Sequence, residues 1–200
     1  MNKMKFLIDV GVGSYTRKTF SPDRYTIWTM QSQFHNLPTV NGVMQAPGRQ
    51  YQARSVKWTA DAERAVFELD LAGAYPPEAG LETWQRRVIL KRREAVIIDE
   101  HYKARRKPRA LFLTLMTPCR VRLQNSLIQL LPRTLPGGDM SGRASVRFDS
   151  LQFRVFVERI PLSDSKMQSV WGDHLTRIRL HLSKPTHEGQ FALRIERYRG

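Results

Sequence analysis

Apolar and polar residues alternate along much of the chain, and this alternation predicts β-strands. The clearest examples are the segments 153–157, 175–182 and 191–198, in which Arg, Glu or His stands between apolar residues, and 145–148 is a further expected strand. Successive side chains of a strand point to opposite faces, so these segments indicate a sheet with one solvent-exposed face. We therefore expect His174 and His181 on the solvent face. A tryptophan in such a strand, for example Trp58, is expected in the core rather than on a ligand-binding surface.

Other strand-like segments follow one another at intervals of about ten residues. They are the ranges 6–10, 51–58, 64–71, 84–90, 95–99, 110–116, 121–123 and 127–131. Helical periodicity of convincing length is nearly absent, and Pro and Gly mark loops at 76–80 and 132–142. Short strands at this spacing predict an all-β fold, a large antiparallel β-sandwich with less than about a tenth of its residues in α-helix. Residues 1–200 are predicted to form a single domain.

The composition indicates a folded domain and excludes several kinds of protein. Hydrophobic residues make up 41% of the chain, which is enough for a core, but no apolar run approaches the roughly 18 residues of a membrane helix. The single cysteine, Cys119, excludes an intrachain disulfide and a zinc site built from cysteines. Too few apolar residues precede Asp9 for a signal peptide, so we expect no export signal in this chain.

The charge balance predicts a polyanionic partner. Lys and Arg number 33 against 18 Asp and Glu, which gives a formal net charge of +15 and a pI near 10.6. A surplus of this size concentrates anions near the surface and speeds their capture. Nucleic acid and acidic polysaccharide both satisfy that requirement. The sequence lacks an RNP-type aromatic run, zinc-ligand spacing and a helix-turn-helix pattern, so nucleic acid is the less favoured partner.

Residues 6–45 carry the most specific pattern in the chain. Its pieces are Asp9-Val10-Gly11-Val12-Gly13-Ser14-Tyr15, then Tyr25, Trp28 and Ser32, then His35-Asn36, and finally Val40-Asn41-Gly42 with Gln45. Looser matches follow at 72–75, 87–90, 96–99 and 171–178. In this order the pieces resemble the heparinase II/III-like polysaccharide lyases, at the beginning of their C-terminal β-sheet domain.

The resemblance implies an architecture and a reaction. It implies an N-terminal α/α toroid followed by the β-sandwich, with the polysaccharide bound between the two domains. Such lyases cleave an acidic polysaccharide, with or without sulfate groups, by β-elimination at a uronic acid. One group neutralises the carboxylate, a base removes the C5 proton, and an acid protonates the leaving oxygen. The family also implies a periplasmic or secreted location.

The match begins within a few residues of the N-terminus, so we expect a fragment of a longer lyase that lacks the toroid and its tyrosine. By this resemblance the chain is part of a carbon–oxygen lyase, and we expect the 200 residues alone to be inactive. One alternative is a non-catalytic fragment that binds acidic polysaccharide. A less favoured alternative is a basic nucleic-acid-binding protein.

The candidate site residues lie in the same segment. The resemblance assigns His35 to the catalytic cleft, either in proton transfer or as an imidazolium that neutralises the uronate. It places Asn36 beside it as a substrate-binding neighbour, and Arg17 and Arg24 are candidates for gripping a carboxylate or sulfate. Without the resemblance, His35 would be interpreted as a residue at the end of a strand, and Arg17 and Arg24 as ordinary charged residues of a loop. We expect the strand with Trp28 to deliver His35 to an edge of the sandwich, its ring nitrogens open to solvent and a basic residue nearby.

A metal site is a weaker expectation. Some members of the family use β-domain histidines as metal ligands, and His35, Asp99, His101 and Asp61 are candidates by residue type for Zn or Ca. No spacing links these four residues. Where relatives often have a further histidine, this chain has an apolar segment at 112–116. The sequence therefore predicts no certain cofactor.

Overall fold

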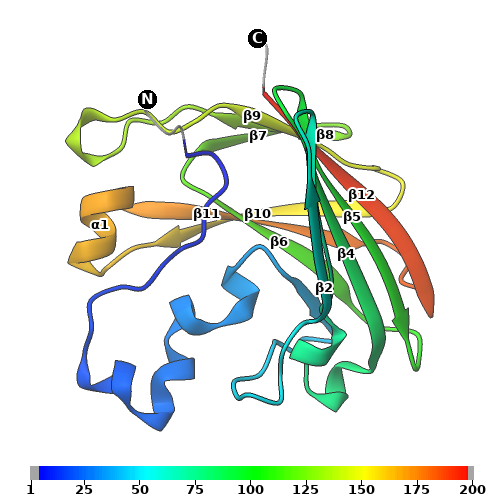
Figure 1. Ribbon diagram of the computed structural model, residues 1–200. Helices are drawn as coiled ribbons and strands as arrows, with labels where there is room; N and C mark the ends of the chain where they lie inside the picture. Colours follow the sequence, from blue (N-terminus) through cyan, green and yellow to red (C-terminus); the bar gives the residue numbers. More distant parts are fainter. Residues whose placement is uncertain (1–4, 198–200) are drawn as a thin grey trace.

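The structure, a computed structural model, describes residues 5–197 and consists mainly of two antiparallel β-sheets (Figure 1). The small sheet has the strand order β1 (Pro38–Val40), β6 (Leu111–Thr117), β11 (His174–Leu182) and β10 (Phe153–Pro161). The large sheet has the order β2 (Arg54–Ala60), β3 (Arg64–Asp70), β4 (Leu81–Lys91), β5 (Ala95–Ala104), β12 (Glu188–Glu196), β9 (Ala144–Arg147), β8 (Leu127–Leu131) and β7 (Arg120–Gln124). The predicted antiparallel β-sandwich is confirmed.

The main hydrophobic core lies between the two sheets. Alternate residues of each strand face it, as the two-residue period requires. On the large sheet, Trp84 and Tyr102 occupy paired positions of β4 and β5, with ring centroids 5.5 Å apart, and Phe191 of β12 packs edge-on against Trp84 at 6.2 Å. On the small sheet, Ile178 and Leu180 of β11 face the same core. These residues are all buried, so the aromatic cluster anchors one sheet against the other.

The segment before β1 is not a strand, and the expectation that a strand carries Trp28 is wrong. Residues 6–10 have no strand structure, and residues 17–34 form four short 3-10 turns. These turns are η1 (Arg17–Phe20), η2 (Pro22–Thr26), η3 (Trp28–Met30) and η4 (Ser32–Phe34). Pro22 fixes the backbone at the start of η2, and the Ser21 hydroxyl accepts the Asp23 N–H at 3.2 Å. Local capping therefore favours turns over a strand in this segment.

This N-terminal segment covers part of the small sheet on the face away from the main core. Ile8 and Val10 pack there against Met116 of β6 and Leu175 of β11 in a second buried cluster. Met116 and Leu175 belong to the outward rows of their strands, because Leu115 and Ile178 face the main core. A backbone hydrogen bond from Ile8 N–H to the Met116 carbonyl at 3.0 Å joins the segment to β6.

The remaining elements are short. In the described residues the α-helical content is one helix, α1 (Ser165–Trp171), in which the Asp164 side chain accepts the Met167 N–H at 2.9 Å. Further 3-10 turns are η5 (Ala72–Ala74), η6 (Pro77–Ala79) and η7 (Pro136–Gly138). No helix of the described residues is long and apolar enough to span a membrane.

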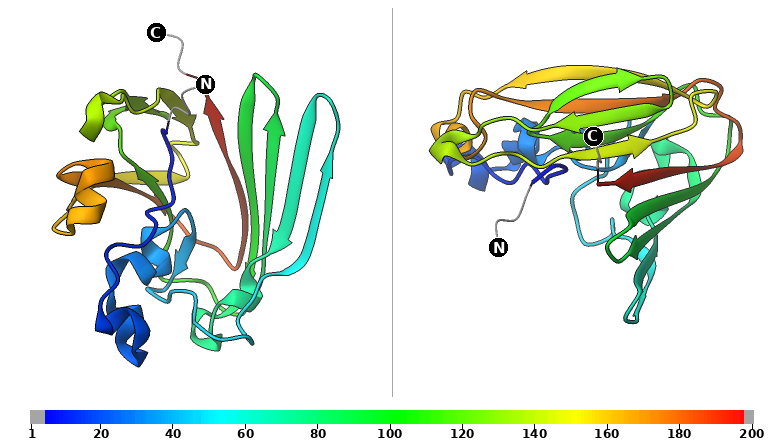
Figure 2. Two further views of the ribbon diagram at one scale, coloured as in Figure 1. Left: turned by 60° about the vertical axis from the view of Figure 1, so that its left-hand side comes forward. Right: turned by 90° about the horizontal axis from the view of Figure 1, so that it is seen from above.

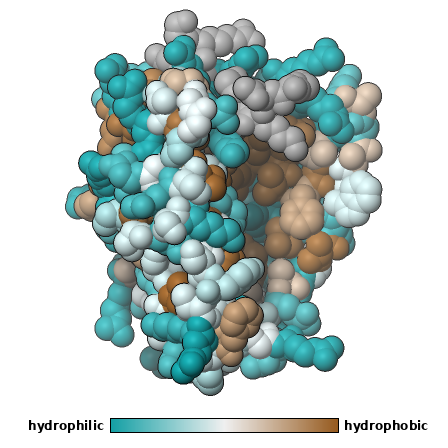
Figure 3. All heavy atoms as spheres, turned by 90° about the vertical axis from the view of Figure 1, so that its left-hand side faces the viewer, coloured by the Kyte–Doolittle hydropathy of each residue, from teal (hydrophilic) through white to brown (hydrophobic). Residues whose placement is uncertain are grey.

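One end of the large sheet extends beyond the small sheet, and its inner face is uncovered there. The cyan strands β2 and β3 stand apart from the small sheet, and the surface shows a hollow with hydrophobic walls (Figures 2 and 3). Trp58 is 74% exposed and pairs across β2 and β3 with Phe67, and Leu90 follows on the same face of β4. We call Trp58, Phe67 and Leu90 the apolar strip. The expectation of a core position for Trp58 is therefore wrong.

Candidate functional site

His35 lies directly after η4, and its ring is held on both sides. Nδ1 is 2.8 Å from Asp9 Oδ2, and Nε2 is 3.0 Å from the Thr29 carbonyl oxygen. The side chain is 23% exposed. The expectation that the ring nitrogens are open to solvent is therefore wrong. Thr29, within the turns, places its carbonyl against Nε2, and Asp9, in the segment before them, places its carboxylate against Nδ1.

The His35 ring faces two acceptor oxygens, one at each nitrogen. A neutral imidazole has one N–H and satisfies one acceptor, whereas the imidazolium donates to both. Gly11, at a φ of +69°, turns the chain so that its N–H donates to Asp9 Oδ1 at 2.9 Å. Desolvation opposes ionisation of Asp9, but the hydrogen bonds from His35 and Gly11 and the charge of His35 outweigh it and lower the pKa of Asp9. The arrangement is a carboxylate paired with a ring whose two nitrogens both face acceptor oxygens.

Asn36 connects two parts of the backbone. Its Nδ2 donates to the Ile8 carbonyl at 3.0 Å, and its Oδ1 accepts the Met116 N–H at 2.9 Å. The side chain thus ties the N-terminal segment to β6. This contact is structural, and a role of Asn36 in substrate binding stays a prediction.

The ion pair between Arg86 and Glu100 is buried and contacts the backbone of Asn36. The Asn36 carbonyl accepts from Arg86 Nη1 at 2.8 Å, and Arg86 Nε donates to Glu100 Oε1 at 2.7 Å. Trp84 Nε1 donates to the other oxygen of Glu100 at 2.6 Å. Burial raises the pKa of Glu100, while Arg86 and Trp84 oppose that shift by donating to its carboxylate. This network, which joins the site segment to the core of the large sheet, was not predicted from the sequence.

The structure does not join Arg17 or Arg24 to His35. Arg17 begins η1 and Arg24 lies in η2, and both are exposed. The Arg24 guanidinium lies 5.5 Å from the centre of the Tyr25 ring. Within the described residues neither side chain forms a hydrogen bond or ion pair with His35. Their role in gripping an anion stays a prediction.

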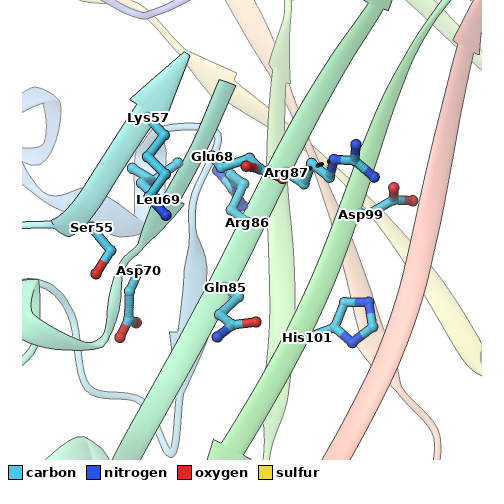
Figure 4. Close-up of a pocket in the computed structure, with 10 residues that line it drawn as sticks. All are labelled: Ser55, Lys57, Glu68, Leu69, Asp70, Gln85, Arg86, Arg87, Asp99 and His101. Carbon is cyan, nitrogen blue, oxygen red and sulfur yellow. Dashed lines mark ion pairs between the residues drawn. The ribbon is translucent and has the colours of Figure 1, made fainter. Parts of the chain in front are cut away.

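The candidate metal ligands also lie apart. Asp99 and His101 are on the outer face of the large sheet, where they line an open pocket of about 390 Å³ with Glu68 and Arg87 (Figure 4). Asp61 lies in the turn between β2 and β3, where its carboxylate accepts the Glu63 and Arg64 N–H groups. The described residues contain no group of three or more potential ligands. They therefore do not fit a zinc site by themselves, since zinc needs at least three converging protein ligands.

Comparison with known proteins identifies the fold. No family model and no curated protein matches the sequence. Among solved structures, heparan sulfate lyase HepC from Pedobacter heparinus has a TM-score of 0.71 and 14% identity over 98% of this chain. Two heparinase III structures have TM-scores of 0.65 and 0.64 at 10% identity. The chain spans 28–29% of the length of these structures. The resemblance is thus confirmed at the level of the fold.

Proposed function

We propose that the chain is the β-sandwich part of a lyase that cleaves an acidic, uronate-containing polysaccharide by β-elimination. The observation that carries this proposal is the likeness to HepC, which extends over 98% of the chain with a TM-score of 0.71. The net charge of +15 agrees with a polymer that bears a carboxylate or sulfate on most of its sugars. A lyase of this kind acts in the periplasm or outside the cell, where such polymers are met.

His35 supports a defined part of this reaction. In the described structure its ring donates to the carboxylate of Asp9, and a uronic acid presents the same chemical group. Exchange of the Asp9 carboxylate for the substrate carboxylate would place a positive ring on the uronate and make its C5 proton more acidic. The C5 base and the acid for the leaving oxygen then come from a further domain, such as the toroid of similar lyases.

A second candidate is a module that binds acidic polysaccharide without cleaving it. The observation that favours it is the ring of His35, both of whose nitrogens have protein partners. The two candidates share the ligand, so one binding experiment tests what they have in common.

The test is calorimetric titration of the purified chain with a heparan sulfate oligosaccharide and with duplex DNA of equal charge, at about 50 and 150 mM salt. We expect the oligosaccharide to bind at least about ten times more tightly at the higher salt. Both affinities should fall with salt, since charges are screened over about 8–10 Å in this range. Equal affinity for DNA, or no binding of the oligosaccharide, would contradict the proposed function.

A further inference from the structure

The outward row of β11 contains three nitrogen atoms that are buried without a hydrogen-bond partner. They belong to Arg177 (Nη1), Arg179 (Nε) and His181 (Nε2), which alternate on the face of the small sheet away from the core. The Arg177 side chain is only 8% exposed. A buried polar group without a partner is costly, so native proteins keep few of them. The three nitrogens are themselves shielded from solvent, so a ligand of this row would contact the exposed parts of its side chains.

Aromatic rings hold this row in place. The Arg177 guanidinium lies 4.4 Å from the centre of the Phe34 ring, next to His35 in the chain. The His181 ring stacks on Phe112 at 4.7 Å and meets Phe156 edge-on at 4.8 Å. Phe156 is 48% exposed although it is a large apolar side chain. The row therefore combines fixed cations with an apolar ring that faces solvent.

The charge of the row is positive. In the described structure its ion-pairing carboxylate is Glu158 of β10, which lies 2.6 Å from Arg177 Nη2 and 3.8 Å from Arg179 Nε. Arg154, the register partner of His181, is exposed on the same face. Arg179 is 30% exposed, and its contact with Glu158 is an ion pair at 3.8 Å, so the exposed part of its guanidinium can also bind an anion.

We propose that this row is a subsite for a linear polyanionic sugar chain, in which Arg179 binds a carboxylate or sulfate and Phe156 packs against a sugar ring. The inference rests on the proposed function and identifies the surface that contacts the polymer. The row spans about 13 Å, because each residue of a strand adds about 3.3 Å. It runs from Arg177, beside Phe34, to His181, and Phe156 lies opposite Arg179. That length allows contact with more than one charge of the polymer.

The test compares two variants with two controls in titrations with the heparan sulfate oligosaccharide. Arg179→Gln and Phe156→Ser should each weaken binding, by about tenfold for the arginine because it loses charged hydrogen bonds. Arg122→Gln, on exposed β7 of the other sheet, and Leu151→Ser, in an exposed turn, should leave the affinity unchanged. Arg177 is left intact because its side chain is buried and paired with Glu158, so its replacement would test folding as well as binding. Each variant should have the melting temperature of the wild type, which shows that it is folded.

Side-chain NMR of the histidines locates the ligand independently. The ring resonances of His181 should shift on addition of the oligosaccharide, and those of His101, on the outer face of the large sheet, should not. If the wild-type chain binds but Arg179→Gln binds equally well, or if His101 shifts instead, the inference is wrong while the proposed function stands. If the wild-type chain does not bind at all, both fail. Duplex DNA bound with equal affinity and the same loss on Arg179→Gln would overturn the assignment to a sugar chain.

Discussion

His35 and Asn36 are neighbours in the sequence, yet their side chains do different work. The ring of His35 donates toward the Asp9 carboxylate at the surface, whereas the amide of Asn36 bonds to backbone groups of two segments. The motif alone did not distinguish these roles, because both residues belong to one ordered pattern. Asp9 was in the same pattern, and its proximity to His35 depends on how 25 intervening residues fold, which alternation does not reveal.

Replacing Asn36 should therefore reduce stability. In Asn36→Ala the N–H of Met116, a fully buried residue, loses its acceptor, and we expect the free energy of unfolding to fall by about 1–3 kcal/mol. Urea denaturation measures the change. Gln124→Ala, on exposed β7, is the matched control and should stay within about 0.5 kcal/mol of the wild type. Wild-type stability of Asn36→Ala would show that the amide is not a structural link.

His181 should give the folding stability a measurable pH dependence. Burial, and after it the charges of Arg179 and Arg177, lower the pKa of His181 below its ordinary value of 6.5. Arg154 and Glu158 on β10 are the other charged groups that face the row, and β6 presents none there. The folded chain thus binds fewer protons than the unfolded chain, so this contribution to stability is present above about pH 6.5 and is lost as the pH falls below it.

The measurement is the free energy of unfolding between pH 7 and pH 5. The wild type should lose more stability over this range than His181→Gln, in which the titrating ring is absent. His187→Gln, at an exposed turn, should follow the wild type. Identical pH slopes for His181→Gln and the wild type would contradict this account.

At the scale of the elements, the sequence predicted strands better than it predicted exposure. Strands β3, β4, β6, β8 and β11 lie within a few residues of the expected ranges, because their apolar period matches the core they face. Buried charged residues were the exception. Arg86 and Glu100 stand on the core face of β4 and β5, and Arg177 of the expected solvent row is buried under Phe34. Each depends on a partner distant in sequence, which a local period cannot identify.

Trp58 and Trp84 both lie in strands of the large sheet, but Trp84 is buried and Trp58 is exposed, so their replacement should affect stability differently. Trp84→Phe removes a buried N–H that donates to Glu100, and we expect it to lower the free energy of unfolding by about 1–3 kcal/mol. Trp58→Phe is the matched control, and its effect should be below about 0.5 kcal/mol because the ring is exposed. Thermal denaturation of both variants gives the comparison. A larger loss for Trp58 would mean that the hollow is covered in solution.

At the scale of the molecule, the alternation could not reveal that the sheets differ in size. A large sheet of eight strands and a small sheet of four leave the apolar strip uncovered. Uncovered apolar surface binds hydrophobic dyes and promotes association. Trp58→Ser combined with Phe67→Ser should therefore reduce the fluorescence of a bound naphthalene sulfonate dye. Unchanged fluorescence would place the dye site elsewhere, and Leu151→Ser, a change outside the strip, is the control.

The positive charge is also a property of the whole molecule, and by itself it does not choose between sulfate, phosphate and carboxylate. The proposed function selects a uronate polymer, and it rests on a fold similar to that of a heparan sulfate lyase. His35 favours it too, since its ring already donates to a carboxylate. Specificity for the carboxylate is therefore the claim that separates this account from attraction by charge alone.

The most direct test is to titrate the chain with a heparan sulfate oligosaccharide and with the same oligosaccharide after its uronate carboxylates are reduced to alcohols. The sulfates remain, so the comparison isolates the carboxylate. The account predicts that reduction weakens binding by about tenfold or more, the value of a charge-assisted hydrogen bond. Equal affinity for the two oligosaccharides would contradict it.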